Sequence, residues 1–220
     1  MMNNPAVKLV RPADHVYGIV KRRIMLNELK PMAVLTELGL AHEIGCSQGT
    51  IREALLRLQE DGLVIRTGRR GTVVTRLEDE EAEEMLALRR RLEMRGAERA
   101  TRNVDARSLD AIMAIRETMN EAAEAGDEFQ LIEADKDFHL AIFRLSRLEA
   151  LEQILARCIM HTHRSKLWAP RHRRPLDETA RRHDVLIERL VARDGPGLAE
   201  ELGLHIDTIV LEEDPAEVNA

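Results

Sequence analysis

The sequence predicts a mainly α-helical protein in two parts, and three observations support this prediction. Apolar residues recur at helical spacing through most of the 220-residue chain. Strand signals are confined to residues 63–75, where two short apolar runs flank a loop rich in glycine and arginine. The net charge of −6 hides a change of sign, because residues 1–77 carry +5 and residues 78–220 carry −11. The basic part therefore suits a polyanion, and the acidic part must serve another purpose.

The first part begins with two predicted helices. Residues 16–29 form an amphipathic segment, which Pro31 ends. Thr36 can cap a short second helix that runs through Ile44, and Gly45 makes the turn after it.

The segment after this turn is the most informative stretch of the chain. Ser47 can cap a third helix by accepting a hydrogen bond from a free backbone N–H, and Gly62 suits the left-handed position beyond its end. Polar residues on the other faces of this helix remain available for contacts. Four apolar residues at helical spacing form its buried stripe: Ile51, Ala54, Leu55 and Leu58.

Two strands and a basic loop follow the third helix. Residues 63–66 and 72–75 predict a two-stranded wing, with Arg69 and Arg70 at its tip. Such a tip can place charge and bare backbone against phosphates or in a minor groove. Three helices and this wing predict a winged helix-turn-helix over residues 10–77.

The start of the third helix and the wing supply the candidate DNA contacts. Gln48, Thr50 and Arg52 are expected to face the major groove, and Arg57 to meet the backbone. Phosphate contacts should dominate the affinity, so binding should weaken steeply with salt. The full set of candidate DNA-binding residues is Ser47, Gln48, Gly49, Thr50, Arg52, Arg57, Arg69, Arg70 and Gly71.

The second part, residues 78–213, is predicted to be helical almost throughout. Short loops between amphipathic helices predict an antiparallel bundle of six or seven helices. Residues 214–220 have the composition of a loose acidic tail. The helices are expected near residues 79–102, 106–125, 127–146, 149–167, 176–193 and 196–212.

Polar residues recur on the apolar faces of three of these helices. Asp135 and His139, four residues apart, lie in the middle of one apolar arc, and His183 and His205 lie on later apolar stripes. A carboxylate in a core is costly unless it is paired or bound to a metal. The four residues form a plausible ligand set for one divalent metal ion per chain, zinc first, with nickel and manganese as alternatives. The alternative interpretation makes the histidines hydrogen-bonded core residues.

Arg89 is a further polar residue on an apolar face. It lies among apolar neighbours on the helical wheel, whereas Arg91 faces away. A buried arginine needs an anion, either Glu93 on the same face or the carboxylate of a bound effector. The remaining histidines are expected to be exposed or incidental: His15, His42, His161, His163 and His172.

Composition excludes several other classes of protein. Aromatic residues make up 2% of the chain, which argues against a stacking platform for single-stranded nucleic acid. Cys46 and Cys158 lie far apart without metal-type spacing, as is usual in a reducing compartment. No apolar run is long enough to span a bilayer and no signal-peptide core is present, so we expect a cytoplasmic protein without a membrane partner.

With these residues in view, the chain resembles a GntR-family transcription regulator of the FadR-like subgroup with an FCD domain. The resemblance covers about residues 12–212. In the first part the family pattern is matched by Leu35, Leu40-Ala41, Ile44-Gly45-Cys46-Ser47, Ile51-Arg52-Glu53-Ala54-Leu55, Leu58, Gly62-Leu63-Val64 and Gly71. In the second part it is matched by Arg89, Leu92-Glu93, Asp135-x-x-Phe138-His139, His183, Asp194 and His205.

The resemblance implies a homodimer that binds a palindromic double-stranded DNA operator, with one winged helix in each half-site. It also implies that Asp135, His139, His183 and His205 are the metal ligands of the effector domain. Arg89 matches a family arginine that often lies in the effector pocket, and effectors of this family are commonly small carboxylates.

This chain departs from the family pattern at two places. Gln48 stands where the family usually has arginine, and Thr50 stands where it has proline, which puts the usual operator sequence in doubt. After the Asp/His helix, residues 145–148 lack the asparagine of the family turn, so any ligand contact made by that asparagine is lost.

Two other functions compete with a ligand-responsive regulator. A metal-dependent enzyme could use the Asp/His₃ site to activate water, although no convincing general base accompanies these residues. A constitutive DNA-binding protein would have the same first part, and its histidines would only be core residues.

Overall fold

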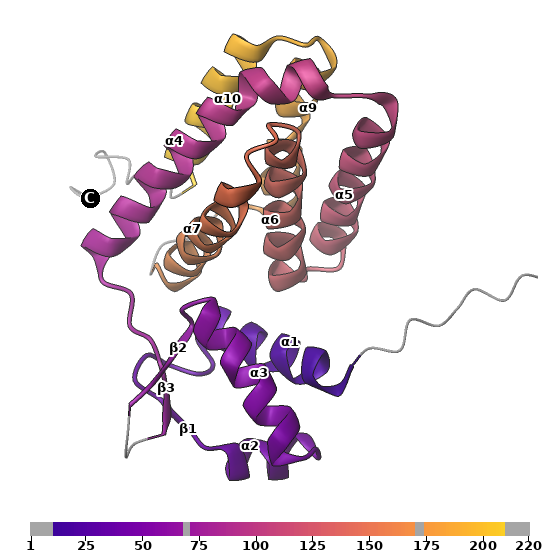
Figure 1. The fold of residues 1–220 in the computed structure, drawn as a ribbon. Coiled ribbons are helices and arrows are strands. Elements are labelled where there is room, and N and C mark those ends of the chain that lie inside the picture. The colour runs from indigo at the N-terminus through magenta and orange to yellow at the C-terminus, as the bar shows by residue number, and fades with distance from the viewer. Residues whose placement is uncertain (1–10, 68–70, 170–173, 210–220) are drawn as a thin grey trace, which may run out of the picture. The chain divides into compact units, whose positions relative to one another are not determined.

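The computed structural model describes residues 11–67, 71–169 and 174–209 of the chain. Backbone contacts divide it between Arg76 and Leu77 into two compact units, and each is described by itself (Figure 1). The predicted wing-tip residues Arg69 and Arg70 and the predicted tail at 214–220 lie outside the described residues. Within the described part, no helix is long and apolar enough to cross a membrane.

The first unit contains three helices and a small antiparallel sheet. Proline at the start of α1 suits a helical first turn, and Ser47 caps α3 by accepting from the Thr50 backbone N–H at 3.1 Å. The helices are α1 (Pro12–Met25), α2 (Glu37–Ile44) and α3 (Gln48–Glu60). The strands are β1 (Val34–Leu35), β2 (Val64–Arg66) and β3 (Thr72–Val74).

Two predictions for this unit need correction. The sheet has three strands in the order β1-β3-β2, because the chain after Pro31 is extended and pairs Val34 with Val73 of the wing. A two-residue strand carries too little periodicity to be recognised. Helix α1 begins and ends about one turn earlier than expected, and Asn27 beyond it has a left-handed φ of 60°.

One apolar core holds this unit together. Val20 and Ile24 of α1 and Val74 of β3 have no exposed surface. The predicted stripe of α3 supplies the rest of the core, with each side chain at most 2% exposed: Ile51, Ala54, Leu55 and Leu58. The α3 face that carries the candidate DNA contacts is therefore turned away from the core.

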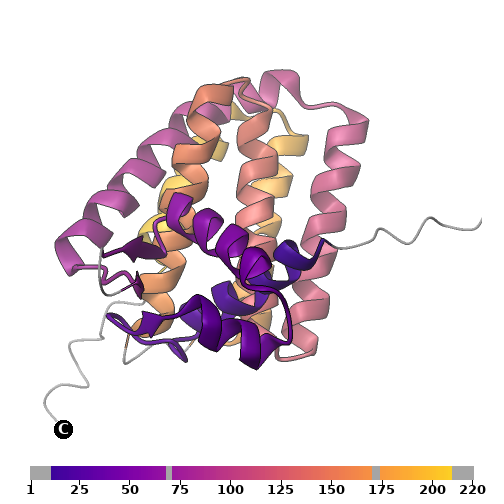
Figure 2. The ribbon, with the colours of Figure 1, turned by 60° about the horizontal axis from the view of Figure 1, so that its bottom comes forward.

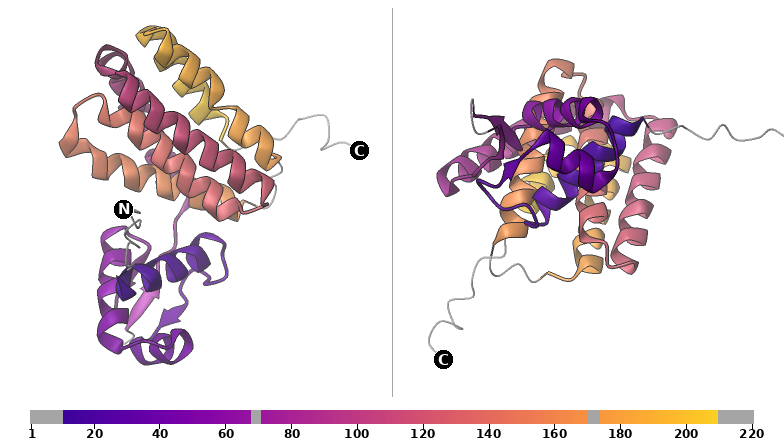
Figure 3. Two further views of the ribbon diagram at one scale, coloured as in Figure 1. Left: turned by 90° about the vertical axis from the view of Figure 1, so that its right-hand side faces the viewer. Right: turned by 90° about the horizontal axis from the view of Figure 1, so that it is seen from below.

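The second unit is a bundle of seven helices in the described residues. Helices α4 and α10 pack together, as do α5 with α6 and α4 with α7 (Figures 2 and 3). Its core includes fully buried Phe138, Met119 and Leu186. The helices are α4 (Asp79–Asn103), α5 (Ala106–Glu124), α6 (Glu128–Arg144), α7 (Glu149–Trp168), α8 (Leu176–Arg181), α9 (Asp184–Val191) and α10 (Gly195–Asp207).

The predicted single helix over residues 176–193 is wrong, because the chain breaks between α8 and α9. At the break, Nδ1 of His183 lies 3.1 Å from the carbonyl oxygen of Thr179 and 3.2 Å from that of Ala180. A side chain that bonds to nearby carbonyls competes with the helical backbone ladder. The hydrophobic period continues through the break, which is why the sequence pattern does not reveal it.

We predict that Gly195→Ala destabilises the bundle. A Cβ at Gly195 would lie 2.9 Å from the Cα of Glu98 and 3.0 Å from the Thr101 hydroxyl, so α10 would have to move away from α4. Overpacking of this kind costs roughly 1–3 kcal/mol of the free energy of unfolding, measured by urea titration.

The matched control is Gly203→Ala on the same pair of helices. A Cβ there would meet only the ends of the flexible Arg90 and Met94 side chains, at 3.2 Å. Alanine also favours a helix interior by roughly 0.5–1 kcal/mol over glycine. Equal losses of stability in the two variants would show that the close approach of α4 and α10 at Gly195 is not the cause of the lost stability.

Candidate functional site

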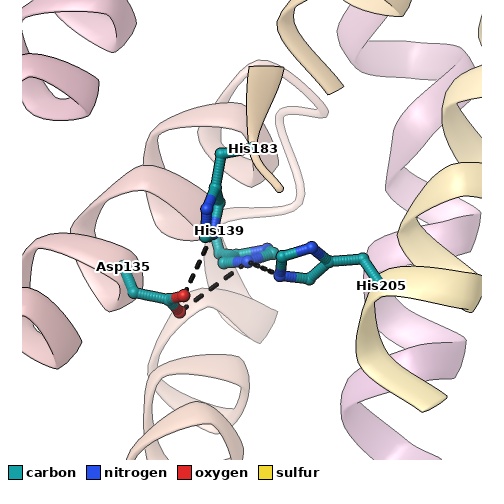
Figure 4. Close-up of side chains that lie close together, drawn as sticks. All are labelled: Asp135, His139, His183 and His205. Atoms are coloured by element: carbon teal, nitrogen blue, oxygen red, sulfur yellow. Dashed lines mark hydrogen bonds and ion pairs between the residues drawn. The ribbon is translucent and has the colours of Figure 1, made fainter. Parts of the chain in front are cut away.

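The four candidate metal ligands converge inside the second unit (Figure 4). Asp135 and His139 come from α6, His183 stands at the start of α9, and His205 belongs to α10. One potential ligand atom from each lies within 4.8 Å of all the others, and all four residues are buried. Helical spacing thus identified side chains that the fold brings together from three separate segments.

Hydrogen bonds orient two of the imidazole rings. Nδ1 of His139 lies 2.5 Å from Oε2 of Glu93, and Nδ1 of His183 faces the carbonyl oxygens of Thr179 and Ala180. These oxygens can only accept, so we assign a proton to Nδ1 of both rings. The Nε2 lone pairs are therefore free to bind a cation, which is the usual arrangement behind metal-bound histidines.

The remaining ring nitrogens and carboxylate oxygens face one another, and two of them, His183 Nε2 and Asp135 Oδ2, have no hydrogen bond in the described residues. Nε2 of His139 lies 3.3 Å from Nε2 of His205, and Nε2 of His183 lies 3.0 Å from Oδ1 of Asp135. Despite the short distance, His183 Nε2 has no hydrogen bond of acceptable geometry within the described residues, and neither does Oδ2 of Asp135. Converging buried lone pairs of this kind fit a divalent cation.

The protonation states also suit a metal site. Burial lowers the pKa of His183, and burial together with the neighbouring His183 and His139 rings lowers the pKa of His205 well below its ordinary value. Burial opposes ionisation of Asp135, but His163 and His139 outweigh it and hold the pKa of the carboxyl well below its usual range. The neutral imidazoles of His183 and His205 and the ionised carboxylate of Asp135 are the forms that bind a metal.

His163 is the residue that sequence reasoning missed. It was expected to be exposed or incidental, but it is 4% exposed and its Nε2 lies 2.9 Å from Oδ2 of Asp135. A signal was present, because His163 follows fully buried Ile159 by one helical turn and Leu155 by two. It is outside the group of four potential ligands and contacts Oδ2 of Asp135.

Arg89 and Glu93 form a buried pair beside this group. Arg89 Nε donates to Oε1 of Glu93 at 2.7 Å, and its Nη1 donates to the Thr162 hydroxyl at 3.3 Å. Burial opposes ionisation of Glu93, but His139 and Arg89 lower its pKa to about 2. Arg89 Nη2 lies 3.8 Å from Oδ2 of Asp135 and has no hydrogen bond in the described part of the chain. Glu93 therefore satisfies one edge of the guanidinium and leaves Nη2 for another acceptor.

The candidate DNA contacts of the first unit lie at the exposed start of α3. Ser47, Gln48 and Gly49 are exposed there. Arg52 is 55% exposed and makes a two-point ion pair with Glu37 of α2, with Nε–Oε1 at 3.0 Å and Nη2–Oε2 at 2.6 Å. The second helix therefore holds the arginine of the third in one orientation.

Arg57 and Gly71 have different surroundings. Arg57 pairs with Asp14 of α1, and its guanidinium lies 4.3 Å from the centre of the Tyr17 ring, which ties α3 to α1. Gly71, beside the wing tip, has a left-handed φ of 82°, which favours glycine at this position.

Two family models match the chain. The model of the bacterial regulatory proteins of the gntR family matches residues 12–74, and that of the FCD domain matches residues 84–208. The chain belongs to the FCD family, and a GntR domain precedes its FCD domain. It is therefore a transcription regulator with a DNA-binding GntR domain and an FCD effector domain. These families contain transcription regulators rather than enzymes, which argues against the alternative of a metal-dependent enzyme.

Relatives and solved structures agree with this assignment. The HTH-type transcriptional regulator McbR of Escherichia coli is 28% identical over 182 residues, 81% of each chain. A probable D-xylose utilization operon transcriptional repressor of Paenarthrobacter nicotinovorans is 27% identical over 199 residues, 88% of this chain and 84% of that one. The structure of E. coli McbR/YncC superposes with a TM-score of 0.70 at 26% identity, covering 91% of this chain and 95% of that chain.

We predict that Glu93→Gln destabilises the second unit strongly. Glutamine keeps the shape of the side chain but leaves the Arg89 guanidinium buried without its carboxylate. Removing one partner of a buried ion pair costs roughly 3–5 kcal/mol of the free energy of unfolding. Urea unfolding of the purified full chain measures the loss.

Glu98→Gln on the same helix is the matched control. Its pair with Arg102 is exposed and 3.5 Å long, so its loss should cost less than about 1 kcal/mol. A similar loss in both variants would mean that the Arg89–Glu93 pair contributes no more than a surface pair.

Proposed function

We propose that the protein is a ligand-responsive, homodimeric regulator that binds a palindromic operator and senses a small carboxylate at a metal site. Residues 10–77 would bind DNA, and residues 78–213 would bind the metal and the effector. The observation that supports this proposal best is the convergence of Asp135 Oδ2, His183 Nε2 and Arg89 Nη2, which have no hydrogen bond in the described residues. A buried site of this kind can hold a divalent cation, which in turn can bind an anion.

In this proposal, the first unit binds DNA through α3. Gln48 and Thr50 at its start, with Arg52 one turn further, would meet base edges in the major groove. The exposed helix start also favours phosphate oxygens. The ion pair with Glu37 limits the freedom of Arg52 before binding, so less side-chain entropy is lost when it meets a base. Arg69 and Arg70 of the wing would contact the DNA backbone or minor groove.

In this proposal, the second unit binds the metal and the effector through the Asp/His₃ group. Asp135 would supply one oxygen and His139, His183 and His205 one Nε2 nitrogen each, and zinc is the expected ion, with nickel or manganese as alternatives. When bound, the ion supplies a positive centre with coordination positions open to a carboxylate. Arg89 Nη2 would then donate to the same effector.

Helix α4 is the element through which the effector would act. It carries Arg89 and Glu93, and it is the first helix after the chain leaves the DNA-binding unit at Arg76. An effector that changes the contacts of Arg89 therefore changes the packing of this helix. Regulation requires that the effector bind one arrangement of the two DNA-binding units of a dimer more tightly than another.

We predict about one divalent metal ion per chain in the wild type and its loss in His183→Ala. The variant removes one of the three Nε2 ligands and leaves the others in place. Elemental mass spectrometry of protein purified without added metal or chelator measures the content.

His161→Ala is the matched control, since His161 is also buried on this unit but lies outside the group of four. It should retain the metal. Wild-type protein without metal, even after reconstitution, would leave the inward histidines as core residues and favour a constitutive DNA-binding protein.

We predict that Arg52→Ala abolishes sequence-specific DNA binding. The variant removes a side chain expected to contact a base, a contact worth roughly 1–3 kcal/mol in each half-site. The operator is first selected from random-sequence duplexes with the wild-type protein, and gel shifts then compare the variants.

Arg102→Ala removes the same charge from an exposed position of the second unit and should bind as the wild type does. Unchanged binding of Arg52→Ala would overturn the role given to α3.

A further inference from the structure

Three cationic side chains, Lys166, Arg174 and Arg182, lie close enough to influence one another electrostatically. Lys166 near the end of α7 and Arg174 before α8 are each 6% exposed. Arg174 Nη2 donates to the carbonyl oxygen of Thr208 at 2.9 Å, and Arg182 Nη1 donates to the same oxygen at 3.5 Å. The two guanidinium groups therefore lie side by side.

This cationic cluster of Lys166, Arg174 and Arg182 borders the Asp/His₃ group. Arg182 directly precedes His183, and its Nη2 donates to the carbonyl oxygen of His205 at 2.9 Å. Lys166 follows His163 by one helical turn, and His163 is the residue 2.9 Å from Oδ2 of Asp135. The cluster is thus joined to the candidate metal site through both His183 and Asp135.

The positive charge of the cluster is poorly matched by the protein. Nε and Nη1 of Arg174 have no hydrogen-bond partner in the described residues, although the side chain is buried. Nε makes an ion pair of 3.4 Å with the half-exposed carboxylate of Glu178, so Nη1 is the nitrogen that has neither a hydrogen bond nor an ion pair in the described residues. Burial lowers the pKa of Lys166 to about 8; Asp135 opposes this shift, and Arg174 and Arg182 act in the same direction as burial. Burying unmatched charge is costly, so this arrangement calls for an anion.

Capping of α10 explains only part of the cluster. Cations near the end of a helix can bond its last carbonyl groups and interact favourably with the helix dipole. That accounts for Arg182 and for Nη2 of Arg174, which reach His205 and Thr208. It does not account for Nη1 of Arg174, which is buried and has no hydrogen-bond partner in the described part of the chain.

We propose that the effector carries a second anionic group, which the cationic cluster binds while the first group lies at the metal and Arg89. The inference rests on the proposed function and narrows its effector class. The ligand is a compact acid with two or more negative groups, a di- or tricarboxylate or a phosphate-bearing carboxylate, rather than a monocarboxylate. Arg174 is the specificity-determining residue, since its fork of donors suits a carboxylate or a phosphate.

The test titrates the metal-loaded full chain with acetate, succinate, citrate and phosphoglycolate at equal ionic strength, by calorimetry. We expect at least one of the three polyanions to bind at least tenfold more tightly than acetate. Phosphoglycolate against succinate and citrate distinguishes a phosphate from a second carboxylate. In Arg174→Gln the preference for the polyanion should disappear, with acetate affinity and metal content unchanged.

A second readout separates binding from a structural role. Without any polyanion, Arg174→Gln should raise the melting temperature, because it removes a buried charge that only the half-exposed Glu178 carboxylate offsets, whereas loss of a purely structural arginine would lower it. The control is Arg181→Gln, an exposed neighbour paired with Asp177 on α8, which should leave the polyanion preference unchanged.

The outcomes keep the two proposals apart. Metal-loaded protein that binds all four acids alike, that binds none of them, or whose polyanion preference survives in Arg174→Gln overturns the second anion site and leaves the metal site standing. Protein that holds no metal overturns the proposed function. The cluster is then tested with inorganic phosphate alone, whose stabilisation of the wild type must vanish in Arg174→Gln.

Discussion

The buried carboxylate of Asp135 is the constraint on which the architecture of the second unit depends. Only 6% of this residue is exposed, so water cannot solvate its charge and the protein must do so. The atoms that face it come from α4, α7 and the start of α9: Arg89 Nη2, His163 Nε2 and His183 Nε2. A bundle that failed to close these helices around α6 would leave a bare charge in an apolar core.

The local structure around Asp135 follows from the same constraint. The break between α8 and α9 lets the His183 ring bond to two carbonyl groups and still direct Nε2 toward the carboxylate. The Phe138 ring packs edge-on against His183 at 4.9 Å and against His139 at 5.8 Å, which fixes both imidazoles from the apolar side. Ring orientation is therefore set by the protein before any ion binds, and pre-organisation of this kind favours tight metal binding.

Helical periodicity predicted the fold and the four converging residues because it determines which way a side chain points. Asp135 and Arg89 stood out because a charge on an apolar face contradicts the pattern around it. The features that periodicity missed depend on contacts between distant segments. Strand β1 exists because it pairs with β3, and the break at His183 exists because a ring replaces backbone hydrogen bonds. His163 was overlooked because a single histidine on a helix gains significance only from the carboxylate it meets.

Charge links the metal site to the cationic cluster. Glu93 is engaged by Arg89 and His139, and Asp135 faces histidines on several sides, so only the half-exposed Glu178 carboxylate offsets the charge of Arg174. A bound divalent ion adds further positive charge to this interior. A polyanionic effector would neutralise the positive charge of the cationic cluster and that of the bound ion at once. Its affinity would depend on helices α4, α7 and α8 keeping their positions. A ligand that stabilises one packing of α4 in this way has the differential affinity that a regulatory response requires, whereas a ligand held by the metal alone would contact only α6, α9 and α10.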